Sequence, residues 1–363
     1  MKPLVSVVMP VRNEGTYIER SLGSVLHQSY RPLEVLLVDG SSTDDTRGRA
    51  RALAARHPDV AFEIVDNPER TAPFALNRGI RAARGEFLVR VDGHCEIGPE
   101  YVTNGVAHLE RGTGDGVGGV LDTVGETVVA RAIAGAMSSR FGVGGSGFRT
   151  ARGDFEPRLV DTVAFPAYRR ETVLSVGGFD EELKRNQDDE FNFRLRRAGL
   201  RIALVGDMPS RYYSRATLRR LLKQYLQYGF YKVRVLQKHP RQMSARQFAP
   251  ALLVLALFAT TAWAIASPIL ALIPLLTLAG LYAFLLLVGT ALNAPRLGAG
   301  ATPIFPLACA LLHFGYGVGS IAGLVRFAGR WGDREGSPGA LGTWAERQSQ
   351  DDARPREETG SAS

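Results

Sequence analysis

The chain has 363 residues, a formal net charge of +8 at pH 7 and two cysteines, Cys95 and Cys309. Two cysteines exclude a disulfide framework and favour a reducing compartment. The positive charge suits an anionic partner such as a nucleotide phosphate or an acidic lipid. Aromatic and basic residues are not interleaved as they are in nucleic-acid-binding surfaces, so we expect no nucleic-acid partner.

The first hundred residues alternate short apolar runs with stretches of helical spacing. The predicted strands are residues 5–9, 34–38, 62–65 and 87–91. Between the first two strands, Ile18, Leu22, Val25 and Leu26 recur at helical spacing. Repeated β-α-β units predict a doubly wound, mostly parallel sheet. No glycine-rich dinucleotide fingerprint follows the first strand, which disfavours a dehydrogenase-type fold.

Polar residues follow three of these strands. They are Pro10-Val11-Arg12-Asn13-Glu14 after the first, Asp39-Gly40-Ser41-Ser42 after the second and Asp92-Gly93-His94 after the fourth. Open α/β sheets bind ligands at the carboxyl ends of their strands. A solvated turn explains any one of these groups, but the three together predict a single site.

Two further features lie in the middle of the chain. Residues 117–147 are rich in glycine, which is typical either of a mobile loop or of backbone that approaches a ligand closely. Residues 187–198 predict a short helix that begins with Asp188, Asp189 and Glu190. Three adjacent carboxylates complement the helix dipole, yet they exceed what capping requires and favour a chemical role.

The last part of the chain predicts membrane association. Residues 215–247 are expected to form a basic amphipathic helix in a membrane interface. Three apolar stretches are each long enough to span a bilayer: 249–267, 268–289 and 302–325. Pro268 marks either a tight outer turn or a kink within a re-entrant hairpin. Residues 331–363 are polar and are expected to be disordered.

Charge predicts the orientation of these spans. Basic residues before the first span place the catalytic domain on the cytoplasmic face of the inner membrane, in a multi-pass protein. Three spans would leave the tail outside, whereas Arg326, Arg330 and Arg334 favour a tail inside. The sequence leaves this conflict open. The expected organisation is a catalytic domain over 1–214, the interfacial helix over 215–247, a membrane region over 248–330 and the tail.

The order of the motifs resembles that of the family 2 glycosyltransferases, which have the GT-A fold. The motifs are Pro10-x-x-Asn13-Glu14, Asp39-Gly40-Ser41-Ser42-Thr43-Asp44, Asn77-Arg78-Gly79 with Gly85, Asp92-Gly93-His94, Gly177-Gly178-Phe179-Asp180 and Gln187-Asp188-Asp189. The chain is similar in particular to the succinoglycan-type exopolysaccharide glucosyltransferases. The resemblance covers residues 4–235 and implies a GT-A catalytic domain followed by transmembrane helices.

The resemblance also implies roles for individual residues. Asp92 and His94 match the metal-binding Asp-x-Asp motif, which implies Mn2+ or Mg2+ on the diphosphate of a nucleotide sugar. Asp188, six residues before Arg194, matches the catalytic base, with Asp189 as the alternative and helix capping as a purely structural reading of both. The implied nucleotide-sugar contacts are Pro10, Arg12, Asn13, Glu14, Asp39, Asn77, Gly85 and Asp92. Asp189, Arg169 and Gln224 are accessory candidates on the acceptor side.

The implied activity is inverting transfer of a hexose, expected to be glucose from UDP-glucose, onto a lipid-linked saccharide. The chain lacks the Gln-x-x-Arg-Trp motif of processive synthases, which favours addition of a single sugar. Two alternatives stay open. One is transfer directly to a polyprenyl phosphate. The other is a catalytically silent membrane scaffold, which the unusual residues Gly40, His94 and Gln187 motivate.

Overall fold

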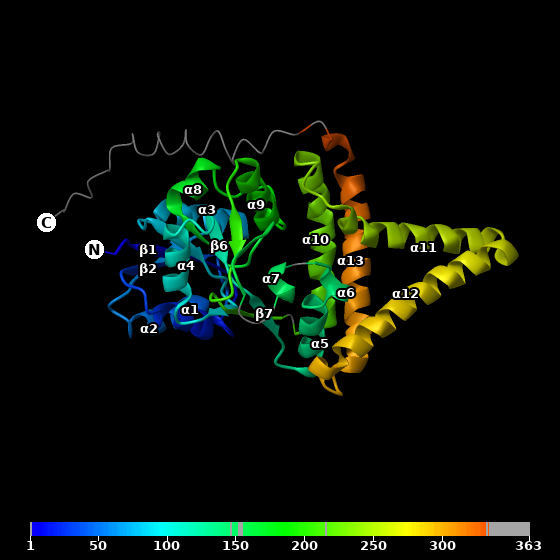
Figure 1. The fold of residues 1–363 in the computed structure, drawn as a ribbon, viewed down its shortest axis with the longest axis horizontal. Coiled ribbons are helices and arrows are strands. Elements are labelled where there is room, and N and C mark those ends of the chain that lie inside the picture. Colours follow the sequence, from blue (N-terminus) through cyan, green and yellow to red (C-terminus); the bar gives the residue numbers. More distant parts are fainter. Residues whose placement is uncertain (1, 146, 152–154, 215, 332, 334–363) are drawn as a thin grey trace.

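The computed structural model describes residues 2–145, 147–151, 155–214, 216–331 and 333 (Figure 1). Over these residues the larger sheet comprises β1 Val5–Val11, β2 Leu33–Asp39, β3 Ala61–Asp66, β4 Phe87–Arg90, β6 Gly116–Gly118, β8 Arg158–Leu159, β9 Ala167–Arg169 and β10 Ile202–Leu204. Its strand order is β3-β2-β1-β4-β9-β6-β10-β8. A smaller sheet comprises β5 Cys95–Ile97, β7 Leu121–Val124 and β11 Ser210–Tyr213, in the order β5-β11-β7.

Helices cover both faces of the larger sheet and continue into the C-terminal region. Those of the catalytic domain are α1 Ile18–Leu26, α2 Thr46–Ala54, α3 Ala72–Ala82, α4 Tyr101–Glu110, α5 Val128–Met137, α6 Arg140–Val143, α7 Gly147–Thr150, α8 Arg170–Ser175 and α9 Gln187–Arg197. The others are α10 Leu218–Lys238, α11 Ala249–Ala266, α12 Pro268–Leu297 and α13 Phe305–Arg326, with short 3-10 turns at Ala245–Gln247, Thr302–Ile304 and Ala328–Arg330.

The parallel core of the sheet confirms the predicted fold class. β1 lies between β2 and β4, and all three run parallel. β1 and β2 are buried over almost their whole length, because helices pack on both faces of the sheet. α1 and α4 pack on one face, and α3 and α9 pack on the other. The carboxyl ends of β1, β2 and β4 therefore meet at one edge.

Most of α10 is enclosed by protein, contrary to the expectation of an interfacial helix, and its exposed residues include Arg219, Arg220 and Lys223. It runs between the catalytic domain and α13 (Figure 1). Leu221 and Tyr225, which lie on the apolar face of this amphipathic helix, are buried in the main core. Gly319 of α13 lies so close that an added Cβ would come 2.1 Å from the Leu226 carbonyl oxygen. The apolar face of α10 is therefore covered by protein, since glycines allow the two helices to approach closely.

α11 and α12 form a hairpin that projects away from the rest of the molecule (Figure 1). The chain reverses at Ser267 and Pro268, so the proline marks a turn between two helices. In the described part of the chain, three helices are long and apolar enough to cross a membrane: Ala249–Ala266, Ile269–Leu297 and Thr302–Arg326. In the most apolar 18-residue stretch of each helix, the buried share is 0%, 6% and 39%, respectively. Protein therefore covers much more of the third helix than of the other two. Apart from Trp331 and Asp333, the expected disordered tail lies outside the described residues.

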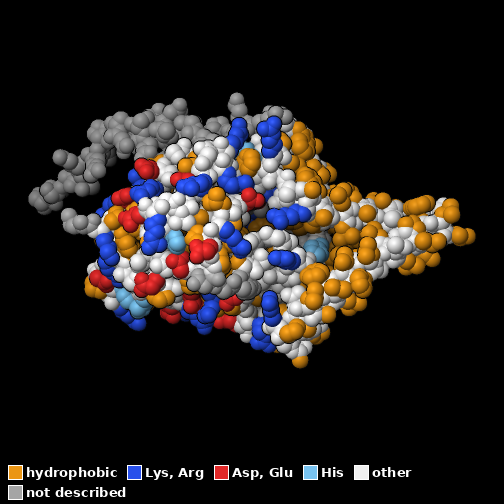
Figure 2. Space-filling model, viewed as in Figure 1, with side chains coloured by type: hydrophobic (Ala, Val, Ile, Leu, Met, Phe, Trp, Pro, Cys, Tyr) orange, Lys and Arg blue, Asp and Glu red, His pale blue; other side chains and the backbone are white. Residues whose placement is uncertain are grey.

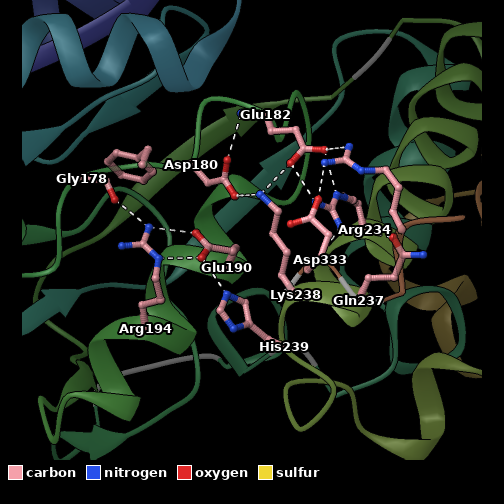
Figure 3. A network of polar contacts seen from close by, with 12 residues as sticks. Gly178, Asp180, Glu182, Glu190, Arg194, Arg234, Gln237, Lys238, His239 and Asp333 are labelled. Carbon is pink, nitrogen blue, oxygen red and sulfur yellow. Dashed lines mark hydrogen bonds and ion pairs between the residues drawn. The ribbon is translucent and has the colours of Figure 1, made fainter. Parts of the chain in front are cut away.

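A network of ion pairs joins α10 to the segment before α9 (Figure 3). Lys238 is fully buried and points between the carboxylates of Asp180 and Glu182. Arg234, also buried, donates from Nε to Glu182 at 2.8 Å. Burial alone would raise the pKa of Glu182, but the hydrogen bonds from Arg234 and Lys238 outweigh it and lower that pKa to about 2. The end of α10 is thus tied to the loop that leads into α9.

Candidate active site

A cleft of about 560 Å³ opens at the carboxyl edge of the larger sheet. Pro10 lies near the carboxyl end of β1, and Asp92 follows the neighbouring strand β4. Asp188 comes from the first turn of α9 on the other side of the cleft. Gln224 and Tyr228 of α10 complete the lining. The structure therefore brings together residues from four separate parts of the sequence.

Asp92 and His94 present the ligand atoms that a divalent cation would need. One carboxylate oxygen of Asp92, one ring nitrogen of His94 and the Cys95 sulfur all lie within 4.8 Å of one another. Burial raises the pKa of the Cys95 thiol, which favours an uncharged thiol over a thiolate ligand. His94 Nδ1 lies 2.9 Å from Glu14 Oε1, an outer contact of the kind that orients metal-binding histidines and leaves Nε2 for the metal. A carboxylate and an imidazole suit Mn2+ better than Mg2+, because Mg2+ prefers oxygen ligands.

Arg90 connects the two key carboxylates of the cleft. Its guanidinium donates from Nε to Asp92 Oδ1 at 2.9 Å, and its Nη1 forms an ion pair with Asp188. The Asp188 side chain is 42% exposed, since it faces the open cleft. Burial among the cleft walls raises the pKa of Asp188, Arg90 opposes that rise, and the charge of Asp92 adds to it. A carboxyl group whose pKa is raised in this way suits a general base.

α10 holds the turn that carries Asp188. Asn186, which precedes α9 with a left-handed φ of 61°, donates from Nδ2 to the Tyr228 carbonyl oxygen at 2.8 Å. Arg185 Nε donates to Gln227 at 3.0 Å. Asp189 forms an ion pair with Lys232, whose side chain is 3% exposed. The alternative base is therefore paired with a lysine of α10, whereas Asp188 faces Arg90.

The expected nucleotide contacts divide into two groups. Pro10, Arg12 and Glu14 line the cleft, together with Gly40. Asp39 is not among the described lining residues, because its carboxylate accepts hydrogen bonds from Ser42 and contacts Arg47. Asn13 also lies outside that lining, and its side chain accepts a hydrogen bond from the Thr43 amide at 2.8 Å. Both residues shape the loops beneath the cleft.

Three other expected site residues have structural contacts away from the described lining of the cleft. Asn77 is buried and exchanges hydrogen bonds with the backbone of Phe179. Gly85 packs so tightly on Ser6 that an added Cβ would lie 2.6 Å from Ser6 Oγ. Arg169 forms an ion pair with Glu86 at 2.7 Å. None of the three is among the described lining residues of the cleft, because each joins strands or loops of the domain.

Gln224 does line the cleft and carries an unusual feature. Its Nε2 donates to the Tyr228 hydroxyl at 2.8 Å. Its Oε1 is buried and has no hydrogen-bond partner among the described residues. A buried polar atom without a partner is rare in proteins and marks a position that a bound ligand can satisfy.

Sequence reasoning missed several cationic residues of the cleft, namely Arg70, Arg90, Arg149 and Arg185. Arg90 had a detectable signal, because it stands two residues before Asp92 in an otherwise apolar strand and so shares a face with it. Arg149 lies in α7, with its guanidinium 5.6 Å from the centroid of the Tyr212 ring. Its place in the cleft depends on the fold of the glycine-rich segment and has no comparable sequence signal.

Comparison with known proteins identifies related sequences. Residues 6–176 match the family model "Glycosyl transferase family 2". The "Succinoglycan biosynthesis protein ExoA" of Rhizobium meliloti (strain 1021) is 35% identical over 248 residues, which cover 67% of this chain and 73% of that protein. The "Dolichyl N-acetyl-alpha-D-glucosaminyl phosphate 3-beta-D-2,3-diacetamido-2,3-dideoxy-beta-D-glucuronosyltransferase" of Methanococcus voltae is 29% identical over 242 residues, covering 64% of this chain and 74% of that protein.

Solved structures share the fold. The "Mannosyltransferase PcManGT from Pyrobaculum calidifontis in complex with GDP-Man and Mn2+" superposes with a TM-score of 0.54 at 21% identity, over 89% of this chain and 88% of that one. This likeness confirms the GT-A fold expected for the catalytic domain. Together with the extent and identity of the sequence matches, it shows that the chain belongs to the family 2 glycosyltransferases and is a glycosyltransferase.

Proposed function

We propose that this protein is a membrane-associated inverting glycosyltransferase that adds one hexose to a lipid-linked saccharide in the synthesis of an exopolysaccharide or a related glycan. The observation that carries the proposal is the pairing of Asp92 and His94 with Asp188 across one cleft, with α10 as a wall. The name of the Rhizobium relative, a succinoglycan biosynthesis protein, supports the pathway class. The name of the Methanococcus relative describes a sugar acceptor on dolichyl phosphate, which supports a lipid-linked acceptor.

In the proposed reaction, an acceptor hydroxyl oxygen attacks the anomeric carbon of the donor sugar. The bond from that carbon to the diphosphate oxygen breaks, and the nucleoside diphosphate leaves with the electron pair. Asp188 receives the proton of the hydroxyl group. A divalent cation held by Asp92 and His94 would supply positive charge to the leaving diphosphate. The Pyrobaculum mannosyltransferase, which is in complex with GDP-Man and Mn2+, supports such a cation.

The chain's own residues would position the two substrates. Pro10, Arg12 and Glu14 border the side of the cleft beside Gly40 and are proposed to hold the nucleotide. Gln224 faces the cleft from α10, and its unpartnered Oε1 is proposed to accept a hydrogen bond from an acceptor hydroxyl. We propose glucose from UDP-glucose as the donor, on the resemblance to succinoglycan-type glucosyltransferases.

The test is donor turnover by the full-length protein in membranes. UDP-glucose, UDP-galactose, UDP-GlcNAc and GDP-mannose would each be supplied with Mn2+, with Mg2+ or with a chelator. We expect one of the four donors to release its nucleoside diphosphate, and we expect this release to depend on the cation. Asp92→Ala should abolish cation-dependent donor binding, whereas Asp188→Asn should retain binding and lower turnover by about 10²- to 10⁴-fold.

Other outcomes would assign a different role. Transfer to polyprenyl phosphate without a preceding sugar would identify the simpler lipid acceptor. Failure to bind any donor in the presence of the cations would contradict the enzyme proposal and favour a membrane scaffold. An α-linked product in the NMR spectrum would contradict inversion.

A further inference from the structure

α13 has the composition of a membrane span, but both of its ends contact the catalytic domain. At its start, Phe305 is fully buried in the main core. Further along, His313 Nε2 lies 2.8 Å from the Phe141 carbonyl oxygen in α6. Just beyond its end, Arg330 forms an ion pair with Glu182, in the loop before α9. Its 22 residues extend over about 33 Å at 1.5 Å per residue, which is about the thickness of the bilayer core.

The helix that lies beside α13 is also in contact with the catalytic domain along its whole length. α10 is joined to that domain by Leu221 near its start, by Tyr228 in its middle and by Lys238 at its end. A bilayer crossed by α13 would also have to contain this side of the catalytic domain, including buried Lys232 and its partner Asp189. Charged residues and open loops of this kind are excluded from the hydrocarbon layer.

The outer face of α13 carries a continuous apolar stripe. Leu307, Val318, Ala322 and Val325 are exposed and fall on one side of the helix. The glycines Gly315, Gly319 and Gly323 occupy another side and pack on α10. Figure 2 shows hydrophobic side chains gathered over the α11–α12 hairpin and the adjoining helices, while charged side chains cover the catalytic domain. An apolar face of this kind on a helix that runs along a protein fits the boundary between headgroups and acyl chains.

We propose that α13 lies flat in the membrane surface with α10 beneath it, and that α11 and α12 alone enter the bilayer, as a hairpin. This inference deepens the membrane association on which the proposed function rests. A hairpin returns the chain to the side from which it entered. The region after α13 therefore lies on the same side as the catalytic domain, and this placement resolves the conflict over Arg326 and Arg330, whose charges favour that side. The occupant of the apolar stripe is the boundary between headgroups and acyl chains, and exposed Arg326 at the end of α13 favours an anionic leaflet.

The inference is tested by labelling single introduced cysteines with a membrane-impermeant maleimide in sealed vesicles of known orientation. The variants are Ala299→Cys before α13, Ala328→Cys after it and Ala52→Cys in α2, which are matched because all three alanines are exposed. The unmodified protein is the blank, since Cys95 and Cys309 are both buried. We expect all three cysteines to react from the same side of the membrane.

A spanning α13 gives a different result, in which Ala299→Cys and Ala328→Cys react from opposite sides. Protection of either cysteine from both sides would equally overturn the inference, since the proposal places both ends of α13 at the aqueous surface. The labelling pattern does not depend on donor turnover. It therefore stands even if the proposed reaction fails, and an active enzyme with the opposite pattern would refute the membrane placement alone.

Discussion

Arg90 is the residue on which the geometry of the cleft depends most directly. It is paired with both Asp92 and Asp188, so its guanidinium fixes the two carboxylates relative to each other. Without it, two negative groups would face each other across the cleft. Their repulsion would raise the pKa of Asp188 further, because Asp92 already acts in that direction.

We therefore predict that Arg90→Met lowers transfer at pH 7 by about 10- to 100-fold, which is no more than the lower limit of the roughly 10²- to 10⁴-fold contributed by a general base, since the base is impaired and not removed. A base acts as its carboxylate, so a higher pKa should move the acid limb of the pH–rate profile to higher pH. Arg169→Met, which removes the surface pair with Glu86, is the control and should leave the profile unchanged. An unshifted profile in Arg90→Met would refute this role.

Glu182 gives a prediction about stability at low pH. Its pKa is lowered to about 2 in the folded protein, although burial opposes this, because Arg234 and Lys238 donate hydrogen bonds to it. A carboxylate with a lowered folded-state pKa stabilises the fold above its unfolded pKa and loses that effect as the pH falls toward 2. Glu182→Gln should therefore unfold at a lower temperature than the wild type at pH 7.

The difference between Glu182→Gln and the wild type should shrink as the pH falls below about 4.3, the ordinary pKa of glutamate. Thermal unfolding followed by circular dichroism at several pH values measures it. Glu171→Gln, at an exposed position in α8, is the control. A difference that is independent of pH would contradict the proposed electrostatic origin.

At the scale of elements, the pairing of α10 with α13 rests on close backbone approach. An added Cβ at Gly319 would clash with the Leu226 carbonyl oxygen at 2.1 Å, and backbone cannot move aside as a side chain can. We predict that Gly319→Ala lowers the free energy of unfolding in detergent by about 1–3 kcal/mol, the usual range for overpacking. Gly280→Ala in α12, where nothing lies within 4 Å, should be neutral or slightly stabilising. Equal effects of the two substitutions would contradict the packing argument.

The elements of the catalytic domain could be predicted from the sequence because their local patterns match their environment. β1 and β2 are apolar except for Ser6, Glu34 and Asp39, and largely apolar runs form strands buried on both faces. Part of the candidate site could be predicted for the same reason, since Asp92 and His94 follow a strand and Asp188 lies in the first turn of a helix. Asp39 and Asn77 were expected at the ligand, but they are short polar side chains that loops can use internally.

The C-terminal elements were harder to predict, because hydropathy reports composition and not what covers a helix. α10 has an amphipathic pattern, which suits a lipid surface and a protein surface equally. α13 is apolar enough to span, yet its small residues pack on protein. Only contacts far apart in the sequence, such as that of Arg330 with Glu182, distinguish the two cases.

At the scale of the whole molecule, the hairpin should be separable from the rest. Val254 of α11 lies beside Gly317 of α13, and Tyr282 of α12 lies beside His313 of α13. Residues 313 and 317 are about one helical turn apart, so the two ends of the hairpin lie close together. A short glycine-serine linker between Val254 and Tyr282 can therefore replace residues 255–281. We predict that the shortened protein folds and still binds anionic vesicles through α13, but that high salt releases it.

The measurement for the shortened protein is cosedimentation with vesicles at low and high salt, with the full-length protein as the control that resists release. Resistance of the shortened protein to high salt would show that the apolar stripe of α13 holds it without help from charge, and would contradict the predicted electrostatic contribution. Loss of binding at low salt would show that the stripe of α13 has no affinity for lipid.

The position of α10 has a consequence for the size of the acceptor. Its inner side lines the cleft with Gln224 and Tyr228, and its outer side carries α13. A helix with its side chains is about 10–12 Å wide, so on the proposed placement α13 and α10 together hold the α10 side of the cleft roughly 20 Å above the lipid. A molecule anchored in the leaflet reaches that height only with enough sugar units below its terminal hydroxyl. The two stacked helices would thus set a minimum length for the acceptor, and the enzyme would select its acceptor by that length as well as by the chemistry of its last sugar.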